Sequence, residues 1–575
     1  MSSHDAQHAA ARSWLALDPD PVTRTELTGL LARAGAGDTL AGAELADCFG
    51  PRLAFGTAGL RGVLGPGPAR MNRLLVAQVS VGLADYLLAQ VPDAARRGVV
   101  IGHDARTNSR VFAEDTAAIL AGRGVRVLLA PRPWPTPVTA YLVTAHGACA
   151  GVMVTASHNP PAYNGYKVYW GNGAQIIPPH DDGIAAAIDR VDLGVAAAAL
   201  AAGRGRGVVI DLTEADHERY LAEVLARRVG AASAPPVRVA YTPMHGVGTA
   251  SVEPLLARAG VPVVTEPSQR EPDAAFPTVA FPNPEEPGAM DRVLALARAE
   301  QAELVLANDP DADRLCVAVP DGERAGGWRV LTGDQVGVLL ADYLLAHAPA
   351  GPRMVATTIV SSQMLGYLAA AAGATYRETL TGFKWIANAA LGWEPSSGGR
   401  FVMGYEEALG YTVGDLVRDK DGVSAALAMA DLAAWNRAQG RTVLGHLDDL
   451  YRRVGLFLTE QVSWNLPGAD GLATIRAAMA RFRAGPPATL AGAAVAEVVD
   501  LARGAGGLPP SDVLVFKVDG GQRVIMRPSG TEPKLKCYYE VRVTLGDGET
   551  IGAARTRGAA ALAALRDEHQ ALLRR

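Results

Sequence analysis

Short apolar runs alternate with Ala-rich amphipathic stretches along most of this chain, and this alternation restricts the fold more than any other feature. The runs are GVVIGHD, VRVLLAP, AGVMVTAS, VRVAYTP, PVVTEP, AELVLAN, RMVATTIV and FVMGYEE. Strands buried on both faces read as continuous apolar runs, and strands that alternate with helices form α/β layers. Because the pattern recurs, we expect three similar α/β units.

The two ends of the chain have different patterns. The first fifty residues have the Ala/Leu spacing of helices, with a helix-start signal at Asp18-Pro-Asp-Pro21. A stretch rich in Gly, Pro and Ala near 484–510 predicts an interruption of regular structure. The runs VLVFKV, QRVIMRPSG and KCYYEVRVTL, followed by an Ala/Leu/Arg helix, indicate a final α+β domain. We expect domain limits of 1–220 (with the helical leader), 221–328, 329–455 and 456–575.

Composition excludes several classes of protein. The chain has 575 residues, of which 49% are apolar and 20% charged, which is typical of several globular domains. It has no apolar run of about 18 residues, and the acid-bearing N-terminus lacks the apolar region of a signal peptide, so we expect a cytoplasmic protein with no membrane partner. A net charge of −5 argues against nucleic acid as a partner.

Cysteine and lysine usage add two expectations. The four cysteines lie more than a hundred residues apart, so we expect buried thiols in a reducing compartment rather than disulfides or a metal site. Only six of the 54 basic residues are lysines, namely Lys167, Lys384, Lys420, Lys517, Lys534 and Lys536. Five of these six lie in or beside polar loops, where a compact ammonium can do what a guanidinium cannot.

A serine follows the apolar run AGVMV in the segment Thr155-Ala-Ser-His-Asn-Pro160. A serine exposed in a turn after a strand can act as a nucleophile. The segment is not the Gly-x-Ser-x-Gly elbow of a hydrolase, and no Ser-His-Asp order is evident. Taken alone, a turn serine is more often a hydrogen-bond partner, so the role of Ser157 depends on the other loops.

Three aspartates follow the run AELVLAN at alternate positions: Asp309, Asp311 and Asp313. On an extended backbone such carboxylates point one way and repel one another unless a cation lies among them. Oxygen ligands suit Mg²⁺. A calcium loop would need Gly at its sixth position and Glu at its twelfth, which are Arg314 and Pro320 here.

Two further loops favour a sugar phosphate as ligand. Glu406 and Glu407, in Gly404-Tyr-Glu-Glu-Ala-Leu-Gly410, can accept hydrogen bonds from sugar hydroxyls. A solvent-exposed acidic turn without a ligand would have the same sequence pattern. The segment Arg527-Pro-Ser-Gly-Thr-Glu-Pro533 combines a guanidinium, hydroxyls and a glycine, which suits a phosphate. No Gly-Lys dipeptide occurs, which excludes a P-loop, and the glycines near Phe55 form no dinucleotide fingerprint.

These four loops, in this order, resemble those of the α-D-phosphohexomutase superfamily from about Phe55 to Glu540. Three further stretches resemble its long branch, which contains bacterial phosphoglucomutases and eukaryotic phosphopentomutase: Asn164-Gly-Tyr-Lys-Val-Tyr-Trp170, Thr242-Pro-Met-His-Gly-Val-Gly248 and Phe281-Pro-Asn-Pro-Glu-Glu-Pro287. The resemblance implies three related α/β domains with mixed sheets and a C-terminal α+β domain around a central cleft. It also implies a monomer or homodimer that binds a small sugar phosphate.

The resemblance implies a role for each loop. Ser157 would carry the transferable phosphate and, with the three aspartates, hold Mg²⁺. The sugar and its other phosphate would be bound by Arg314, Glu406, Glu407, Lys420, Arg527, Ser529, Gly530 and Thr531. Arg61, His158 and Lys384 would lie near the transferring phosphate. Lys384 is the first candidate for proton transfer, and Arg61 would stabilise charge because a guanidinium hardly deprotonates.

The implied reaction interconverts glucose 1-phosphate and glucose 6-phosphate through phosphoserine, with glucose 1,6-bisphosphate as intermediate and activator. Many glucose-specific members have serine where this chain has Ala408, so discrimination among sugars is expected to be looser. Phosphomannomutase and phosphopentomutase activities therefore remain alternatives. A non-catalytic sugar-phosphate sensor and a metal-dependent phosphatase are the competing classes.

Overall fold

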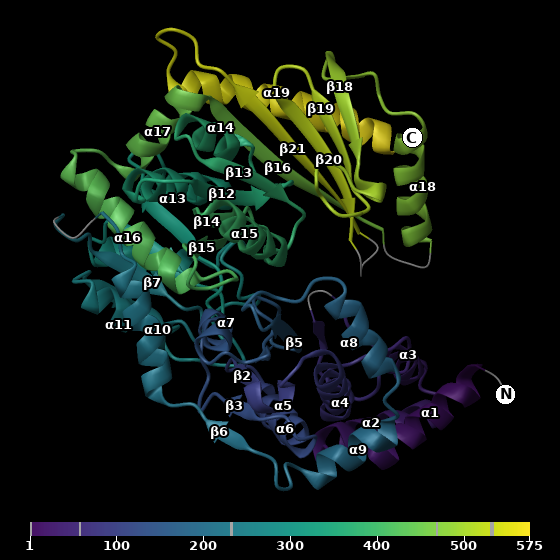
Figure 1. The fold of residues 1–575 in the computed structure, drawn as a ribbon. Coiled ribbons are helices and arrows are strands. Elements are labelled where there is room, and N and C mark those ends of the chain that lie inside the picture. Colours follow the sequence, from purple (N-terminus) through teal and green to yellow (C-terminus); the bar gives the residue numbers. More distant parts are fainter. Residues whose placement is uncertain (1–2, 57–58, 231–233, 467–469, 530–533, 575) are drawn as a thin grey trace. The chain divides into compact units, whose positions relative to one another are not determined.

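The described part of the chain falls into two compact units, each built from two separate stretches. The computed structural model describes residues 3–56, 59–230, 234–466, 470–529 and 534–574, with side chains from residue 6 onward (Figure 1). The first unit comprises Met1–Leu331 and Gly410–Ala434. The second comprises Thr332–Leu409 and Trp435–Arg575.

Three helices precede the first sheet, as the sequence predicts. They are α1 (Ser3–Leu17), α2 (Pro21–Gly35) and α3 (Thr39–Cys48). A carboxylate oxygen of Asp20 accepts the backbone N–H of Val22 at 2.9 Å, so the Asp-Pro signal does begin a helix. Buried leucines of the leader pack with Leu74 of α4 (Arg73–Gln90) and Ile119 of α6 (Ser109–Gly122), which fixes the helices to the first sheet domain.

The first sheet has the strand order β1-β5-β4-β2-β3-β6. Its strands are β1 (Leu60–Val63), β2 (Val99–His103), β3 (Val127–Leu129), β4 (Ala150–Val154), β5 (Tyr163–Trp170) and β6 (Val209–Asp211). β4, β2, β3 and β6 are parallel, whereas β5 runs antiparallel to β4 and β1 antiparallel to β5. The sheet is therefore mixed. Its further helices are α5 (Ala94–Arg97), α7 (Thr136–Ala145), α8 (His180–Asp189) and α9 (Leu193–Ala202).

The second sheet, also in the first unit, has the order β11-β10-β9-β7-β8. Its strands are β7 (Val239–Thr242), β8 (Val263–Thr265), β9 (Leu304–Ala307), β10 (Cys316–Pro320) and β11 (Trp328–Val330). Its helices are α10 (Glu214–Ala226), α11 (Thr249–Arg258) and α12 (Asp291–Ala299). β15 (Gly410–Val413) and most of α16 (Gly422–Ala438) return to this unit later in the chain. Arg314, just before β10, forms an antiparallel bridge with Gly410.

The second unit begins with a third α/β domain. Its central strand β12 (Arg353–Thr358) is parallel to β13 (Thr375–Thr379) on one side and to β14 (Arg400–Glu406) on the other. Its helices are α13 (Gly333–His347), α14 (Met364–Ala371), α15 (Phe383–Ser397) and α17 (Val443–Val454).

The three α/β sheets share one strand order. In each, the first strand is central, the second lies on one side and the third on the other: β4-β2-β3, β9-β7-β8 and β14-β12-β13. All three triplets are parallel. The prediction of three related α/β domains is therefore confirmed.

The last domain is an antiparallel sheet with helices, which confirms the predicted α+β class. Its order is β16-β21-β20-β19-β18-β17. The strands are β16 (Leu456–Asn465), β17 (Thr489–Leu490), β18 (Ala493–Asp500), β19 (Leu514–Val518), β20 (Gln522–Pro528) and β21 (Lys534–Val543). The helices are α18 (Gly471–Ala484), α19 (Ile551–Leu573) and the short η1 (Leu501–Arg503).

The interruption predicted near 484–510 is wrong, because this segment contains β17 and β18. β18 pairs with β19 despite its glycine-rich surroundings, since the alternating Val and Ala of β18 suit a half-exposed strand. One face of the sheet packs on α18 and α19 through residues such as Phe482, Phe516 and Leu565. The opposite face packs on the third domain through Ile359, Leu380 and Ile525.

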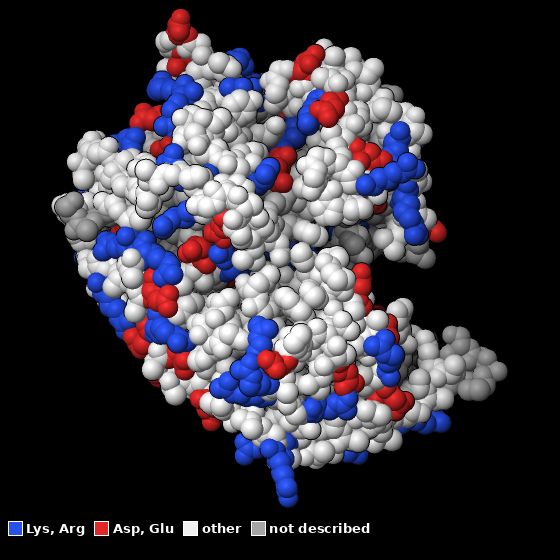
Figure 2. Space-filling model, viewed as in Figure 1, with Lys and Arg blue, Asp and Glu red and all other residues white. Residues whose placement is uncertain are grey.

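Charges of both signs are interspersed over the face shown in Figure 2. Within the described residues, no helix combines the length and the apolar character that a membrane crossing requires. All four cysteines are buried free thiols, as their spacing predicts.

Candidate active site

Three of the sites predicted from the sequence follow the third strand of the parallel triplet in each α/β domain. Ser157 follows β4, Asp309 follows β9, and Glu406 ends β14. Ligands of open α/β sheets bind at the carboxyl ends of the parallel strands, where neighbouring connections leave in opposite directions. The repeated strand order thus explains why chemistry-bearing residues recur at equivalent points of the three domains.

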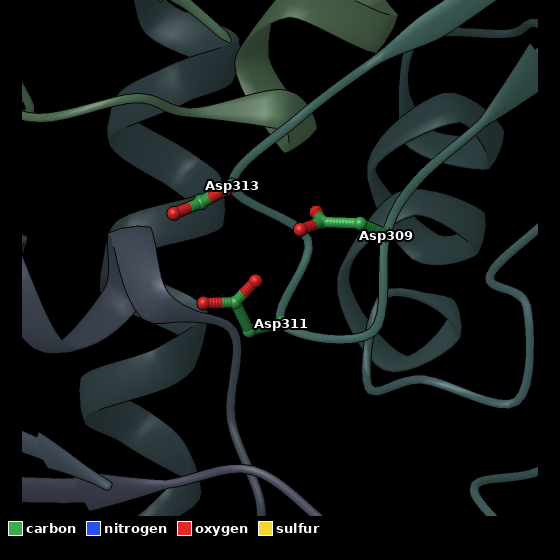
Figure 3. A group of neighbouring side chains, drawn as sticks. All are labelled: Asp309, Asp311 and Asp313. Atoms are coloured by element: carbon green, nitrogen blue, oxygen red, sulfur yellow. The ribbon is translucent and has the colours of Figure 1, made fainter. Parts of the chain in front are cut away.

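The three aspartates converge although their backbone is not extended. Ala312 has φ of 55°, and its N–H donates to the carbonyl of Asp309 at 2.8 Å, so the segment is a tight turn. The extended backbone expected from the sequence is therefore wrong. One carboxylate oxygen of each aspartate nevertheless lies within 4.8 Å of the others, and all three side chains are buried (Figure 3).

Neighbouring segments hold this turn in place. The hydroxyl of Thr136, in the first turn of α7, donates to Asp311 at 2.7 Å, where a helix N-terminus favours negative charge. Gly246 lies directly against the turn: a Cβ on this residue would lie 2.3 Å from the Cα of Pro310. Only a glycine allows this approach, which explains the glycine of the Met-His-Gly segment.

Two lysine ammonium groups contact the aspartates. Lys167 on β5 donates to Asp311 at 2.8 Å and to Asp313 at 2.9 Å. Lys420, from the returning segment 410–434, lies 2.8 Å from Asp313. Burial disfavours a charged ammonium, but the carboxylates outweigh it and raise the pKa of Lys167 above its ordinary value.

The protonation of the aspartates is uneven. Burial, together with the charges of Asp311 and Asp313, raises the pKa of Asp309 well above its ordinary value. Burial acts the same way on Asp311, but Lys167 and Thr136 more than offset it and lower its pKa. Three buried carboxylates cannot all ionise without further positive charge among them.

The donor set fits a hard divalent cation. Oδ1 of Asp311 and Oδ1 of Asp313 are buried and accept no hydrogen bond from the residues that the structure describes. Buried carboxylate oxygens without partners are costly, and oxygen-only ligands at this spacing suit Mg²⁺. The hydroxyl of Ser157 donates to Oδ2 of Asp309 at 2.6 Å, so the serine oxygen lies beside the same group.

Ser157 is held tightly rather than exposed as the sequence indicates. Its side chain is buried, and its φ is 51°, a left-handed conformation that non-glycine residues rarely adopt. Its N–H donates to the hydroxyl of Thr155 at 2.9 Å, and its Oγ lies 3.3 Å from Nδ1 of His158. These contacts fix the direction of the Oγ toward Asp309.

Arg106 is the main support of the serine loop. Its guanidinium donates to the carbonyls of Ser157 and Asn159 at 2.5 Å each, and to that of Pro160 at 3.0 Å. The side chain is buried and paired with Asp104 at 3.4 Å. No sequence pattern assigns Arg106 a role, because the loop that it holds lies some fifty residues further along the chain.

Three other expected residues border the serine loop. Arg61 on β1 donates to the side chain of Asn159 at 2.9 Å. Burial and the charges of Arg314 and Arg61 lower the pKa of His158 to about 2, so this imidazole is neutral near pH 7. Nε of Arg314 lies 3.9 Å from Asp309.

The remaining expected residues lie in the second unit. Glu406 accepts the N–H of Gly382 at 2.7 Å, at the N-terminal end of α15, and Lys384 is buried in the first turn of that helix. Glu407 instead accepts the hydroxyl of Ser361 at 2.9 Å. The two adjacent glutamates therefore have different surroundings: Glu406 lies at a helix terminus near Lys384, whereas Glu407 is tied to the strand end of β12.

The expected phosphate clamp lies between β20 and β21. Arg527 is in β20, and the N–H of Ser529 donates to the carbonyl of Lys534 at 2.7 Å, which closes the hairpin. Gly530 and Thr531 lie outside the described residues.

Sequence models of the phosphoglucomutase/phosphomannomutase family match most of the chain. The models for α/β/α domains I, II and III match residues 52–194, 218–322 and 332–454, and the C-terminal domain model matches 475–550. The chain belongs to the α-D-phosphohexomutase superfamily. It is thus an enzyme of the phosphohexomutase type, an isomerase of carbohydrate metabolism.

Similar members of the superfamily include a "Probable phosphomannomutase" of Haemophilus influenzae, which is 42% identical over 82% of this chain and 93% of its own. A "Probable phosphoribomutase" of Schizosaccharomyces pombe is 39% identical over 92% of both chains. The solved structure of a phosphoglucomutase/phosphomannomutase family protein from Burkholderia thailandensis has a TM-score of 0.66 at 20% identity, covering 91% of this chain and 96% of its own. That structure supports the fold alone.

Sequence reasoning gave no role to several residues that contact the phosphohexomutase site. Lys167 stands out in the sequence because lysine is rare in this chain and because it lies in the Asn164-Gly-Tyr-Lys-Val-Tyr-Trp170 stretch, but neither signal indicates its contact with the aspartates. Thr136 and Arg106 gave no signal at all. Their partners lie far away in sequence, as the 175 residues between Thr136 and Asp311 illustrate.

Proposed function

We propose that this chain is a phosphosugar mutase that transfers a phosphoryl group to and from Ser157. The observation that carries the proposal is the Ser157 hydroxyl, held in a left-handed turn 2.6 Å from an aspartate of a buried triplet. Two oxygens of this triplet accept no hydrogen bond from the described residues. A serine that served only as a helix cap or turn residue would not require such surroundings.

The first unit's residues have separate proposed roles. Asp309, Asp311, Asp313 and an oxygen of the Ser157 phosphate would bind Mg²⁺, which when bound neutralises charge on the phosphoryl group. Arg61 and Arg314 stabilise charge on the transferring phosphoryl, and neutral His158 donates or accepts a hydrogen bond there. Arg106 keeps the serine loop rigid, because it binds three of the loop's carbonyls.

The proposed cycle conserves both phosphoryl groups. In the first step the P–Oγ bond of phosphoserine breaks while a sugar hydroxyl forms a new P–O bond and loses its proton; Ser157 Oγ gains a proton. The sugar bisphosphate then turns over, and its other phosphoryl group returns to Ser157 by the reverse of that chemistry. Positioning and charge neutralisation supply most of the catalysis in such transfers.

The second unit's residues complete the proposal. Glu406 accepts hydrogen bonds from sugar hydroxyls, with Glu407 and Lys420 assisting in substrate binding. Arg527, Ser529, Gly530 and Thr531 bind the phosphate that is not transferred. Lys384 is the proposed proton acceptor and donor. The raised pKa of Lys167 makes that lysine a poor base and favours a structural role for it.

Glucose phosphate is the proposed substrate, with glucose 1,6-bisphosphate as activator. Phosphopentose is the second candidate, because Ala408 lacks the hydroxyl expected of glucose-specific members and a relative named phosphoribomutase is 39% identical. Phosphomannose is the third, after the relative named phosphomannomutase. A rate panel on glucose, mannose and ribose 1-phosphates, with Mg²⁺ and the matching bisphosphate, decides among them. Equal rates on all three would overturn the glucose assignment.

Replacement of Ser157 tests the mechanism directly. Intact-mass analysis of the wild type after incubation with glucose 1,6-bisphosphate should show one added phosphoryl group. Ser157→Ala should add none and should lose turnover by several orders of magnitude, while its melting temperature stays close to the wild type. Ser251→Ala, which also removes a buried serine hydroxyl, is the matched control and should keep the phosphate. Full turnover in Ser157→Ala would sink the mechanism.

A further inference from the structure

A cavity of about 560 Å³ lies within the second unit, between the third α/β domain and the last domain. One side is formed by α14 and β13 and the other by β18, β19 and β20. Among the described residues, none assigned to the mutase site lines it. Ligand cavities of a few hundred Å³ occur preferentially at domain interfaces, so this position and volume suit a small molecule.

The walls of the cavity are mainly apolar. Ile359, Leu501 and Val515 belong to the apolar cluster that joins the two domains, and they extend into the cavity wall. Tyr367 of α14 lines the cavity and has 40% of its surface exposed, although the Arg542 guanidinium lies 4.0 Å from its ring centroid. An apolar ring seated here would bury this exposed surface.

A polar edge lies at one side of these walls. Arg523 donates to Glu378 at 3.1 Å, to Glu540 at 2.8 Å and to the Ser361 carbonyl at 2.6 Å. These bonds use three of the five N–H groups of a guanidinium, which leaves two donors for a ligand among the contacts of the described residues. Glu378 accepts through Oε1 only in these contacts, so its Oε2 can receive a ligand N–H.

The cavity lining is electrically balanced. Lys517 pairs with Glu497 across the β18–β19 ladder at 2.9 Å, and Arg523 pairs with Glu378 and Glu540. The lining residues therefore include two cations and two carboxylates, since Glu540 does not line the cavity, and the lining has no excess positive charge to attract a sugar phosphate. Arg523 as hydrogen-bond donor and the neighbouring Glu378 as acceptor match the edge of a heterocycle that contains an amide group or ring nitrogens.

We propose that this cavity is a binding site for an uncharged heterocycle of nucleobase or nucleoside size. The heterocycle's ring lies against Tyr367 and the apolar wall, and its donor–acceptor edge pairs with Glu378 and Arg523. This site is separate from the proposed mutase chemistry.

Binding of a ligand in the cavity is linked to the proposed phosphate clamp through β20. Arg523 and Arg527 are both in β20, four residues apart, so their side chains lie on the same face of the sheet at about 13 Å spacing. Ile525, between them on that face, packs on the third domain. A ligand that bridges β13 and β20 therefore restrains β20 against the third domain. This consequence rests on the proposed role of Arg527.

Direct binding tests the site without any turnover. Adenosine, uridine and nicotinamide are the probes, and isothermal titration with the full chain is the measurement. We expect saturable one-to-one binding of at least one probe. Ala370→Trp, which fills the cavity from α14, should weaken this binding at least tenfold. Ala371→Trp, at the next helix position and outside the lining, should stay within twofold of the wild type. No saturable binding by any probe, or equal binding by Ala370→Trp, would overturn the proposal.

Two further readouts keep the test decisive if a variant folds poorly. In the wild type, the bound probe should slow hydrogen exchange in residues 364–378 and 497–517; slowing confined to other segments would overturn the site. A saturating probe should also change KM for the sugar phosphate at least twofold in Ala371→Trp and not in Ala370→Trp; an unchanged KM would overturn the link to the clamp. Probe binding by a chain without mutase activity would count against the proposed function only.

Discussion

Lys167 and Lys420 act as internal counter-ions for the three aspartates. Their ammonium groups lie within 2.9 Å of Asp311 or Asp313, in a buried setting where an isolated carboxylate would be very costly. They leave Oδ1 of Asp311 and Oδ1 of Asp313 without hydrogen bonds from the described residues. The lysines therefore stabilise the turn and still leave oxygens for a metal.

Magnesium should stabilise the folded protein measurably. A ligand present at 100 times its Kd adds about 2.7 kcal/mol to the free energy of unfolding. We expect Mg²⁺ to raise the melting temperature of the wild type and chelation to reverse the rise. Asp311→Asn removes one ligand charge and should lose most of the Mg²⁺-dependent rise. An equal rise in wild type and Asp311→Asn would contradict the assignment of the metal site.

Asp334 gives the second unit a pH dependence. Burial, with the charges of Glu407 and Glu540, raises the pKa of this carboxyl to about 7 despite its bond from the Ser362 N–H. The folded state then keeps a proton that the unfolded state releases above pH 4. Stability should fall as pH rises from 4 to 7, by about 4 kcal/mol from this group, and level off above 7.

Asp334→Asn tests this dependence because its amide does not titrate. Urea unfolding of the wild type and the variant should give similar free energies near pH 4. As pH rises from 4 to 7, the free energy of unfolding of the variant should increasingly exceed that of the wild type. A difference that stays constant across this range would show that Asp334 titrates alike in the folded and unfolded states.

Residue types could be predicted from the sequence better than their surroundings. Asp309, Asp311 and Asp313 stand out because three carboxylates in five residues need an explanation. The burial of Ser157 and its left-handed backbone could not be predicted, since both depend on Arg106 and on the strands around the loop. Local patterns give no information on partners that lie fifty or more residues away.

At the level of elements, β5 is the strand on which the serine loop depends. It pairs with β1 on one side and β4 on the other, and it contributes Lys167. Gly165 of β5 is packed between these neighbours: a Cβ there would lie 2.6 Å from the Thr155 carbonyl oxygen and 2.8 Å from that of Leu60. No apolar run predicts β5, because its aromatic and polar residues interrupt the apolar pattern seen in the neighbouring strands. In the sequence these residues stand out only as the Asn164-Gly-Tyr-Lys-Val-Tyr-Trp170 motif.

Gly165→Ala should displace the backbone just before Ser157. Overpacking of this kind costs about 1–3 kcal/mol, and the displaced serine should lower kcat more than it changes KM. Gly42→Ala in α3 is the control, since a Cβ there meets nothing within 4 Å and alanine favours a helix by up to about 1 kcal/mol. Wild-type stability and kcat in Gly165→Ala would show that the strands yield without disturbing the loop.

Strand existence and strand order differ in how well the sequence predicts them. The apolar runs predicted each of the parallel strands β2, β3 and β4, because burial on both faces excludes polar residues. The strand order that places the third strand beside the first is set by the connections between the strands. No local sequence pattern indicates this order. The error at β17 and β18 has a different cause: the glycines and prolines lie in the loops that flank these short strands, and the strands themselves contain none.

On the scale of the whole molecule, the first unit is completed by a segment far along the chain. Segment 410–434 supplies Lys420 to Asp313, Asp421 to Tyr220 and Asp431 to Arg228. The chain therefore leaves the first unit after Leu331 and returns to it at Gly410.

A chain that ends at Leu331 should be strongly destabilised. Removing one partner of a buried ion pair costs about 3–5 kcal/mol, and this truncation removes Lys420, one of the cations beside Asp313, together with Asp431, the partner of Arg228. Calorimetry should show a lower and broader melting transition than in a chain that ends at Ala434, which keeps the whole first unit. A sharp transition at the same temperature in both chains would contradict the importance of the segment.

The interleaved units also set the order in which the enzyme can mature on the ribosome. Synthesis adds about 5–20 residues per second, and domains commonly fold as they emerge. Here Ser157 and the three aspartates are synthesised before Lys420, the ion-pair partner of Asp313. Lys420 is made only after the whole of Thr332–Leu409. A nascent chain therefore exposes its acidic turn with one counter-ion missing until the third domain has been translated.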